Sequence, residues 1–353
     1  MKNIRKIFIL GGANLFAKTT IKHALDLGYA VKAVDLIRPS ELEGVENLEF
    51  LLEDFFDLTD AEAIRLMEDC DSFIYAGGVS DLSVPRKPAG KFFYERNVLP
   101  TGRVARLARK AGIKNFLLLG DYKTEIAEKN ESLRKNAYHK EPYIQTRFMQ
   151  EAIANFEGEP LMNVSVLRPG VVIGKANKSI MEAHIDLVKA NKKIPVTDGV
   201  IPIISAEALA RAAIYALELE GDKKTYAVAT SKISYREIYE IILEVMDKVD
   251  EKSLVEKSFV DLLPAYEKDA KVTNDKCLEH GISQVNMLRS MTMDLSFKSD
   301  FDLGDEDLRE KLRGMIDLYL KGTPVRTDKE GQNPQDMKIE NPTEKRNENT
   351  DEN

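Results

Sequence analysis

Short runs of apolar residues alternate with amphipathic segments along the first half of the chain. The first run, residues 7–10, leads into Gly11 and Gly12, and a helical pattern of apolar positions follows until Gly28. Further apolar runs occur at residues 30–34, 48–52, 72–76 and 114–119, with helical patterns that include residues 60–68 and 97–111. Strands that alternate with helices at this spacing predict an α/β fold, in which a parallel sheet of the Rossmann type is doubly wound by helices.

The turn after the first strand has the spacing of a dinucleotide-binding loop. Its three glycine positions are held by Gly11, Asn14 and Ala17. The start of the next helix offers unpaired N–H groups to a phosphate. Asn tolerates positive φ, so we expect Asn14 to keep the turn's shape, although its side chain would crowd a pyrophosphate. The second strand ends in Asp35, where such units hold an acid for the adenosine ribose. The same stretch also fits a strand, turn and helix without a ligand.

Composition limits the classes of protein that this chain can represent. The 353 residues are 43% hydrophobic, which allows a large core, and the net charge of −8 disfavours nucleic-acid binding. No apolar run approaches the roughly 18 residues of a membrane span, and the first residues lead directly into a strand rather than a signal peptide. Cys70 and Cys277 lie far apart and the four histidines are scattered. We therefore expect a cytoplasmic protein with reduced thiols, no metal site and no membrane or nucleic-acid partner.

The chain beyond residue 174 is expected to supply the substrate side. Its predicted elements are helices near 179–192, 206–218, 235–248 and 305–320, apolar runs at 194–196 and 201–204, and an irregular Met-containing segment at 258–300. We predict a dinucleotide-binding Rossmann domain over residues 1–174, to which strands return from about 195–230, and a smaller substrate-binding subdomain over 175–322. Residues 323–353 almost lack apolar side chains, so we predict a disordered polar tail.

The order of these pieces resembles the extended short-chain dehydrogenases/reductases, the group that contains the NAD-dependent epimerases and dehydratases. The resemblance covers residues 4–322 and rests on the segments 11–14, 57–60, 76–77, 97–98, 143–147, 166–174, 201–210, 226–229 and 234–238. It implies an NAD(P)-dependent enzyme with a C-terminal substrate-binding subdomain. It also implies a homodimer formed through the helices near 97–111 and 142–156.

The resemblance assigns the catalytic pair to Tyr143 and Arg147. In the family a Tyr is the acid/base, and a Lys four residues later lowers its pKa and binds the nicotinamide ribose. Positions four apart share a helix face, so a cation there stabilises a phenolate. Arg147 keeps the charge, but its planar fork has a different shape from an ammonium group. The alternative is a helix with a packed Tyr143 and an exposed Arg147.

Three further residues match catalytic positions of the family. Its substrate-polarising Ser or Thr follows the fifth strand, where this chain has Asp121. An ionised Asp accepts hydrogen bonds and cannot donate one to a carbonyl. The replacement donor is then Thr124 or a protonated Asp121. The alternative is that Asp121 caps a helix or binds a different polar group. Asn97 matches the Asn that supports the catalytic helix, and a buried Asn bonded to backbone is the alternative.

The resemblance also implies the residues around a bound dinucleotide. They are Gly11, Gly12, Asn14, Leu15, Phe16, Asp35, Phe56, Asp57, Ala76, Gly77, Gly78, Arg147 and Pro169. Asp35 favours NAD, because a carboxylate repels the 2′-phosphate of NADP, and Arg38 keeps NADP as the alternative. Arg168, just before Pro169, is either a substrate-side residue or a structural ion-pair partner.

Three functional hypotheses follow. The first is an NAD(P)-dependent oxidoreductase or epimerase-like enzyme, with Tyr143 as acid/base and a small sugar-nucleotide or apolar carbonyl/alcohol substrate. The second is a non-catalytic or redox-sensing dinucleotide-binding protein, supported by the coincidence of Asn14, Asp121 and Arg147. The third is an interaction protein that keeps only the fold.

Overall fold

The computed structural model describes residues 5–174, 180–219, 225–304 and 306–321, which belong to one compact unit over residues 1–323. The predicted disordered tail, 323–353, lies outside the described residues. The proposed domain division at residue 174 stays a prediction.

The central sheet has seven parallel strands in the order β3-β2-β1-β4-β5-β6-β10. Their bounds are β1 Lys6–Leu10, β2 Ala30–Asp35, β3 Leu48–Leu52, β4 Ser72–Tyr75, β5 Asn115–Leu119, β6 Asn163–Pro169 and β10 Thr225–Val228. β1 pairs with β2 on one side and β4 on the other, so Ile9 faces Ala33 and Ile74 in the two registers. The strand order reverses between β1 and β4, which confirms the predicted Rossmann-type α/β fold.

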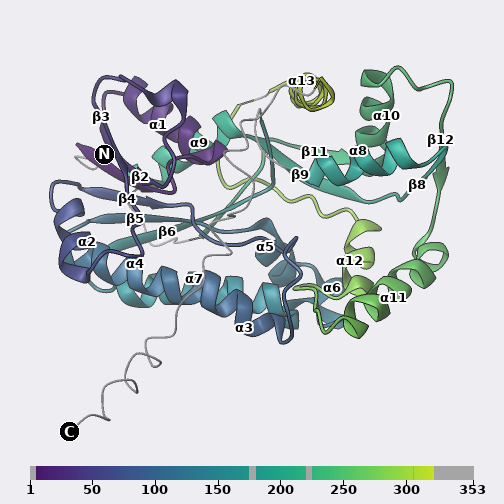
Figure 1. The fold of residues 1–353 in the computed structure, drawn as a ribbon, viewed down its shortest axis with the longest axis horizontal. Coiled ribbons are helices and arrows are strands. Elements are labelled where there is room, and N and C mark those ends of the chain that lie inside the picture. The colour runs from purple at the N-terminus through teal and green to yellow at the C-terminus, as the bar shows by residue number, and fades with distance from the viewer. Residues whose placement is uncertain (1–4, 175–179, 220–224, 305, 322–353) are drawn as a thin grey trace, which may run out of the picture. The chain divides into compact units, whose positions relative to one another are not determined.

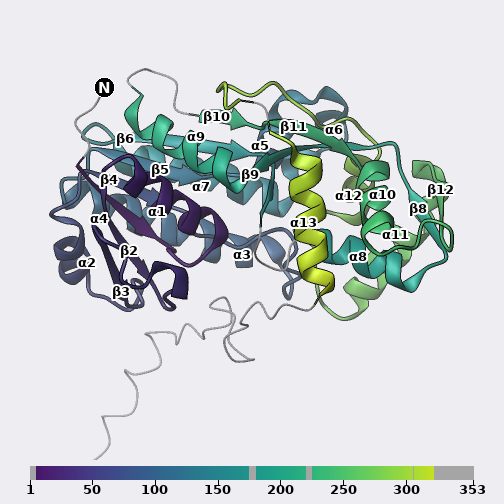
Figure 2. The same cartoon turned by 90° about the horizontal axis from the view of Figure 1, so that it is seen from above.

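Helices cover both faces of this sheet (Figure 1). One face carries α1 (Leu15–Asp26) and α9 (Ala206–Glu218), which lie side by side, as Figure 2 also shows. The other face carries α2 (Asp60–Met67), α4 (Leu99–Lys110) and α7 (Pro142–Gly158). The predicted helix near 97–111 is longer, because α3 (Ala89–Phe93) and a π-helical turn (Tyr94–Val98) precede α4.

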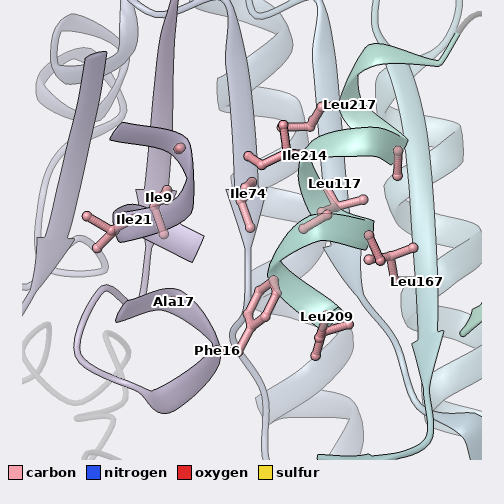
Figure 3. Packing of buried hydrophobic residues seen from close by; sticks show 14 of the residues in the cluster. Ile9, Phe16, Ala17, Ile21, Ile74, Leu117, Leu167, Leu209, Ile214 and Leu217 are labelled. Atoms are coloured by element: carbon pink, nitrogen blue, oxygen red, sulfur yellow. The ribbon is translucent and has the colours of Figure 1, made fainter. Parts of the chain in front are cut away.

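Alternate side chains of each strand enter two separate cores. On the α1 and α9 side, Phe16 and Leu209 lie among strand residues such as Ile74 and Leu117 (Figure 3). On the opposite face, the rings of Phe8, Phe73 and Phe116 stack in a row, with centroids 5.0 and 5.1 Å apart. Burial of one such side chain contributes about 1.5–3 kcal/mol, so these two cores stabilise the sheet from both faces.

The C-terminal elements gather to one side of the central sheet (Figure 1). They form a three-stranded sheet of β7 (Val171–Ile173), β9 (Val200–Ser205) and β11 (Ser231–Ser234), and a strand pair of β8 (Lys193–Val196) and β12 (Ser253–Glu256). A third hydrophobic cluster joins α8 (Ile180–Ala190), α10 (Tyr235–Val245) and α13 (Leu308–Leu320) to these strands.

The expectation of an irregular segment at 258–300 is wrong. This segment contains α11 (Phe259–Asp275) and α12 (Gln284–Met291). α11 begins with a capping box between Ser258 and Asp261 and continues through Pro264. Among its described residues only Thr273 is buried, but half-buried apolar residues recur at helical spacing at Phe259, Leu263, Tyr266 and Ala270, so the sequence does carry the stripe that predicts a helix.

Candidate active site

The turn between β1 and α1 needs its two glycines. Gly11 has φ of +90°, a conformation that other residues rarely adopt. The N–H groups of Gly11 and Gly12 both point to the carbonyl of Val34, at 3.0 and 3.4 Å. A Cβ on Gly12 would come within 3.1 Å of Ala33 and of the Phe50 ring. The turn is therefore drawn tightly onto β2, which leaves the start of α1 facing outward at the carboxyl edge of the sheet.

Asn14 shapes this turn by capping the helix rather than by positive φ. Its φ is −71°, so the expected left-handed backbone is absent at this residue. Its Oδ1 accepts the N–H of Ala17 at 2.9 Å, and its Nδ2 donates to the carbonyl of Gly11 at 3.0 Å. The next residue, Leu15, lies half-buried against Gly174, whereas the ring of Phe16 is buried in the core. Phe16 can thus offer a ligand its backbone but not its side chain.

Asp35 lies at the end of β2, where the ribose-binding acid is expected. Its Oδ2 accepts the N–H of Ala13 at 2.8 Å and its Oδ1 accepts the N–H of Leu36 at 2.7 Å. Each carboxylate oxygen keeps a further lone pair for a ligand hydroxyl. Arg38 is turned to Phe50, donating to its carbonyl and lying 5.2 Å over its ring.

The loop after β4 is held closed by Asn97. A Cβ on Gly77 would overlap the Tyr75 ring at 2.4 Å, and Gly78 has φ of +136°, so both positions require glycine. Asn97 is fully buried and bonds the backbone of Val79 twice: Oδ1 accepts its N–H at 2.7 Å and Nδ2 donates to its carbonyl at 3.3 Å. Asn97 is therefore a buried residue bonded to backbone, as the alternative interpretation of the sequence predicts.

The other expected cofactor residues lie at neighbouring strand ends. Ala76 is half-buried after β4, and Pro169 is buried at the end of β6. Phe56 and Asp57 are exposed in the turn after β3, with Phe56 45% exposed. This turn is held by Arg103, which donates to the carbonyl of Phe56 at 3.3 Å. Phe56 and Asp57 therefore fit the outer rim of a dinucleotide site rather than its buried part.

Tyr143 and Asp121 are brought together at the carboxyl end of β5. Tyr143 lies in the first turn of α7, and Asp121 is the N-cap of α5 (Tyr122–Lys129). The Tyr143 hydroxyl donates to Oδ2 of Asp121 at 2.5 Å. The Tyr143 ring is 2% exposed and packs edge-on against Phe93, with centroids 5.3 Å apart. The backbone N–H of Tyr143 also donates to the carbonyl of Gly281 at 2.8 Å, which ties the pair to the C-terminal segment.

Arg147 is buried, so the alternative of an exposed arginine is wrong. Its Nη1 donates to Oε1 of Gln150 at 2.6 Å and its Nη2 to the carbonyl of Leu119 at 3.1 Å. Its Cζ lies 5.9 Å from the centroid of the Tyr143 ring. Within the described residues, its Nε has no hydrogen-bond partner. Arg147 is thus fixed by the protein and keeps one buried donor.

Lys123 and Asp81 lie beside Asp121, Tyr143 and Arg147, and together these five side chains form the charged cluster of the site. The sequence-based prediction does not include Lys123 or Asp81. Nζ of Lys123 lies 3.1 Å from Oδ1 of Asp81, with side chains 14% and 8% exposed. The backbone N–H of Lys123 donates to Oδ1 of Asp121 at 2.8 Å. Asp81 lies in a loop without periodic pattern, so its pairing with Lys123 has no sequence signal. The position of Lys123 two residues after Asp121 is the one local clue.

Burial and charge set the protonation of this cluster. Burial, followed by the charge of Asp121, raises the pKa of Tyr143 well above its ordinary value, and Arg147 opposes this. Burial alone would raise the pKa of Asp121, but Lys123, Arg147 and the Tyr143 hydroxyl together hold that pKa below its ordinary value. Despite burial, the carboxylates of Asp121 and Asp81 raise the pKa of Lys123 well above its ordinary value. Near neutral pH the pair is therefore a phenol and a carboxylate.

Thr124 is not brought to the Tyr143 hydroxyl. Its hydroxyl is fully buried, 2.7 Å from the carbonyl of Asp121 and 3.0 Å from Oε1 of Glu151, and its one hydrogen is used there. Glu151 in turn binds Arg168 through both carboxylate oxygens, at 3.0 and 2.6 Å. Arg168 also donates to Glu125 at 3.0 Å. These residues form a buried ion-pair cluster, which is the structural alternative for Arg168.

Two kinds of site are absent from the part of the chain that the structure describes. Among the described residues, no group of three or more His, Cys, Asp or Glu side chains is placed to hold a metal ion. Within the same ranges, no helix combines the length and the apolar composition needed to cross a membrane.

Comparison with known proteins identifies relatives of the same fold. A protein of Synechocystis sp. that carries the provisional name dihydroflavonol 4-reductase is 25% identical over 176 residues, which are 47% of this chain and 49% of that protein. The chain thus matches about half the length of this relative. A UDP-N-acetylglucosamine 4-epimerase from Methanobrevibacter ruminantium, solved with UDP-N-acetylmuramic acid, superposes with a TM-score of 0.61 at 16% identity, covering 91% of this chain and 99% of that chain.

Two other solved structures show the same likeness of fold. A UDP-glucose 4-epimerase from Thermotoga maritima, solved with UDP-glucose, has a TM-score of 0.59 at 13% identity over 90% of this chain and 99% of that chain. An enzyme of Bordetella bronchiseptica in complex with NAD⁺ has a TM-score of 0.57 at 17% identity, covering 72% and 86%.

The family model confirms the resemblance seen in the sequence. The model of the NAD dependent epimerase/dehydratase family matches residues 7–229, more than half of the chain. This range begins in β1 and extends just past β10, so it includes all seven strands of the central sheet. The chain therefore belongs to the NAD dependent epimerase/dehydratase family.

Proposed function

We propose that the protein is an NAD-dependent oxidoreductase of the epimerase/dehydratase type, acting on an alcohol or carbonyl carbon of a small molecule. The observation that carries this proposal is the Tyr143–Asp121 pair at the carboxyl end of β5. It lies at the same sheet edge as the Gly11 turn and Asp35, where open α/β sheets bind their ligands.

The residues present fit a dinucleotide. The Gly11–Gly12 turn gives close backbone approach, and the N-terminus of α1 suits a pyrophosphate. Asp35 would accept ribose hydroxyls, and the buried, unpartnered Nε of Arg147 would serve the nicotinamide side. We propose NAD rather than NADP, because Asp35 repels a 2′-phosphate and Arg38 is committed to Phe50.

The protein's own groups would orient the substrate and move its proton. A bound nicotinamide supplies the hydride donor or acceptor. Tyr143 Oη, buried at the sheet edge, exchanges a proton with the substrate oxygen. Arg147 adds a fixed positive charge beside the Tyr143 ring. The opposite charges of Lys123 and Asp81 balance each other in a buried ion pair.

Two substrate classes fit the family, and one assay separates them. The solved epimerases that share the fold are named for UDP-sugars, which supports a sugar nucleotide. The Synechocystis relative is named for a reductase of dihydroflavonols, which supports an apolar carbonyl or alcohol. We propose the sugar nucleotide as the first class to test.

A second candidate function is a dinucleotide-binding protein without turnover. It is favoured by hydrogen bonds within the protein that already use the donors of Tyr143 and Arg147. The Tyr143 hydroxyl donates to Asp121, and the two Nη groups of Arg147 donate to Gln150 and to the carbonyl of Leu119. Such a pair is satisfied before any ligand binds.

Titration of NADH and NADPH by fluorescence, followed by turnover measurements, separates these functions. UDP-glucose, UDP-N-acetylglucosamine and a dihydroflavonol are supplied in turn with the oxidised or reduced cofactor. Tight NADH binding with turnover supports the enzyme, and Tyr143→Phe serves as the inactive control. Binding without turnover on all three supports the second function, and the absence of binding contradicts both.

We also propose a cytoplasmic homodimer. α4 and α7 pack together and expose Leu99, Met149 and Phe156 at 52%, 47% and 76%. A second copy of the chain would cover these side chains. Size-exclusion chromatography coupled to light scattering measures the molecular mass and so tests for the dimer. Phe156→Asp should shift the protein to monomers. Cys70 and Cys277, both free, fit a reducing compartment.

A further inference from the structure

We infer that Asp121, acting through Tyr143, is the group that finally receives the proton of a substrate hydroxyl. This inference rests on the proposed function and assigns Asp121 a role other than that of a hydrogen-bond donor to the substrate. Asp121 is a positioning residue in this scheme, because it acts through the hydroxyl of Tyr143.

The geometry of Asp121 makes it a fixed acceptor. Oδ2 receives the Tyr143 hydroxyl at 2.5 Å, the length of a charge-assisted O–H···O⁻ bond, while Oδ1 is held by the N–H of Lys123 at 2.8 Å. A hydroxyl has one hydrogen and two lone pairs. Because that hydrogen points to Asp121, Tyr143 Oη presents lone pairs to a ligand and is set to accept a proton.

The charges around the pair favour an ionised Asp121. Lys123, from α5, and Arg147, from α7, both lower the pKa of Asp121, while Asp81, from the loop after β4, faces Lys123 at 3.1 Å. Burial first, and then the Asp121 and Asp81 carboxylates, raise the pKa of Tyr143, whereas Arg147 and Lys123 lower it. The ionised form of Tyr143 is therefore disfavoured, and a mechanism that begins with a phenolate would first require the free energy to deprotonate this residue.

The proton step balances as a two-part relay during alcohol oxidation. The substrate O–H bond breaks and its proton passes to Tyr143 Oη, while the Tyr143 proton passes to Asp121 Oδ2. The C–H bond gives its electron pair, as hydride, to the oxidised nicotinamide dinucleotide, and the alcohol becomes a carbonyl. Asp121 ends as a carboxylic acid and Tyr143 as a phenol. Carbonyl reduction runs the same steps backwards.

The first test uses the spectrum of tyrosinate near 295 nm and needs no substrate. The wild-type titration minus that of Tyr143→Phe reports Tyr143 alone. We expect Tyr143 to resist ionisation beyond the usual pKa of about 10. In Asp121→Asn and Asp121→Ser its pKa should fall by at least one unit. Ordinary titration of Tyr143 in the wild type, or an unchanged value in both variants, overturns the inference.

We expect both variants of Asp121 to fold. Asn and Ser are good N-caps, so α5 keeps its first-turn bond. Asp307→Asn is the matched control: Asp307 caps α13 through the N–H of Glu310 at 3.0 Å and lies on a different helix from the pair. It should leave the Tyr143 titration unchanged.

The second test is the pH–rate profile with NAD⁺ and whichever of the three probe substrates the wild type oxidises. Asp121→Asn should slow oxidation at least 100-fold, and Asp121→Ser should move the rate-controlling pKa to alkaline pH, where a phenolate forms. Unchanged rates in both variants overturn the inference. Absence of wild-type turnover on all probes counts against the proposed function, and the tyrosinate titration still decides the role of Asp121.

Discussion

The hydroxyl of Tyr143 on α7 and the carboxylate of Asp121 at the start of α5 are joined by a hydrogen bond of 2.5 Å. The two residues lie 22 positions apart in the chain and meet where β5 ends. An ionised Asp121 accepts this hydrogen bond and has no hydrogen of its own to donate to a substrate carbonyl.

The first prediction concerns cofactor choice. NADH should bind at least tenfold more tightly than NADPH, a difference of about 1.4 kcal/mol, because the carboxylate of Asp35, the proposed ribose-binding acid, would repel a 2′-phosphate. Asp35→Asn should narrow this gap by relieving repulsion of the 2′-phosphate. Fluorescence titration of both proteins with both cofactors measures it. Equal affinities in the wild type would contradict the assignment.

The second prediction concerns Arg147. Arg147→Ala leaves the buried Oε1 of Gln150 and the Leu119 carbonyl without donors, so we expect a stability loss of about 1–3 kcal/mol in urea unfolding. NADH affinity should fall as well, and Arg147→Lys should recover part of it. Arg106→Ala is the control, since this side chain is 39% exposed and lies 3.6 Å from Glu157. Its effect should stay within about 0.5 kcal/mol. Equal losses for the two alanine variants would refute the buried role.

Sequence periodicity predicts the elements that carry the cofactor side. Apolar runs ending in Gly11 and Asp35 specify β1 and β2, because parallel strands buried on both faces need continuous apolar side chains. The acid at the end of β2 is then placed by chain geometry alone. The capping role of Asn14 is less visible, since the same residue type suits both a left-handed turn and a helix cap.

The charged cluster around Asp121, Lys123 and Asp81 could not be predicted from sequence periodicity, because its contacts join residues of different elements. Lys123 meets Asp81 from a loop whose path depends on the buried Asn97, and Thr124 turns to Glu151 rather than to Tyr143. In this cluster the deciding partner comes from a different element, and no local spacing encodes it. Helix α11 differs, because its capping box and its apolar positions at helical spacing from Phe259 are local signals that do predict a helix.

The third prediction concerns the buried Arg168 cluster. Arg168→Ala leaves the carboxylate of Glu151 buried without its cation and removes one of two cations from Glu125, which keeps Lys129, so we expect a loss of about 3–5 kcal/mol at pH 7. The deficit should shrink at pH 5, because protonation removes the unpaired charge. Chemical unfolding at both pH values provides the measurement. Arg236→Ala, which breaks an exposed pair with Glu256, is the control and should cost less than about 1 kcal/mol. A deficit that does not depend on pH would argue that packing, and not charge, is lost.

The last prediction concerns acid stability and His184. This side chain is 7% exposed, its Nδ1 lies 2.9 Å from the Tyr239 hydroxyl, and burial lowers its pKa to about 4. In the unfolded chain a His titrates near 6.5, so between the two values the unfolded state binds more protons. The contribution to stability is therefore fully present above about pH 6.5 and is lost as the pH falls towards 4, by up to about 3 kcal/mol.

His184→Phe keeps a ring in this position and removes the titrating group. Its free energy of unfolding, measured in urea at intervals from pH 7 to pH 4, should fall less steeply with acid than that of the wild type. His280→Asn is the control, because His280 follows α11 in the chain, is more exposed than His184 and lies 3.2 Å from Asp269. If His184→Phe and the wild type lose stability in parallel across this range, protonation of His184 does not limit the acid stability of the fold.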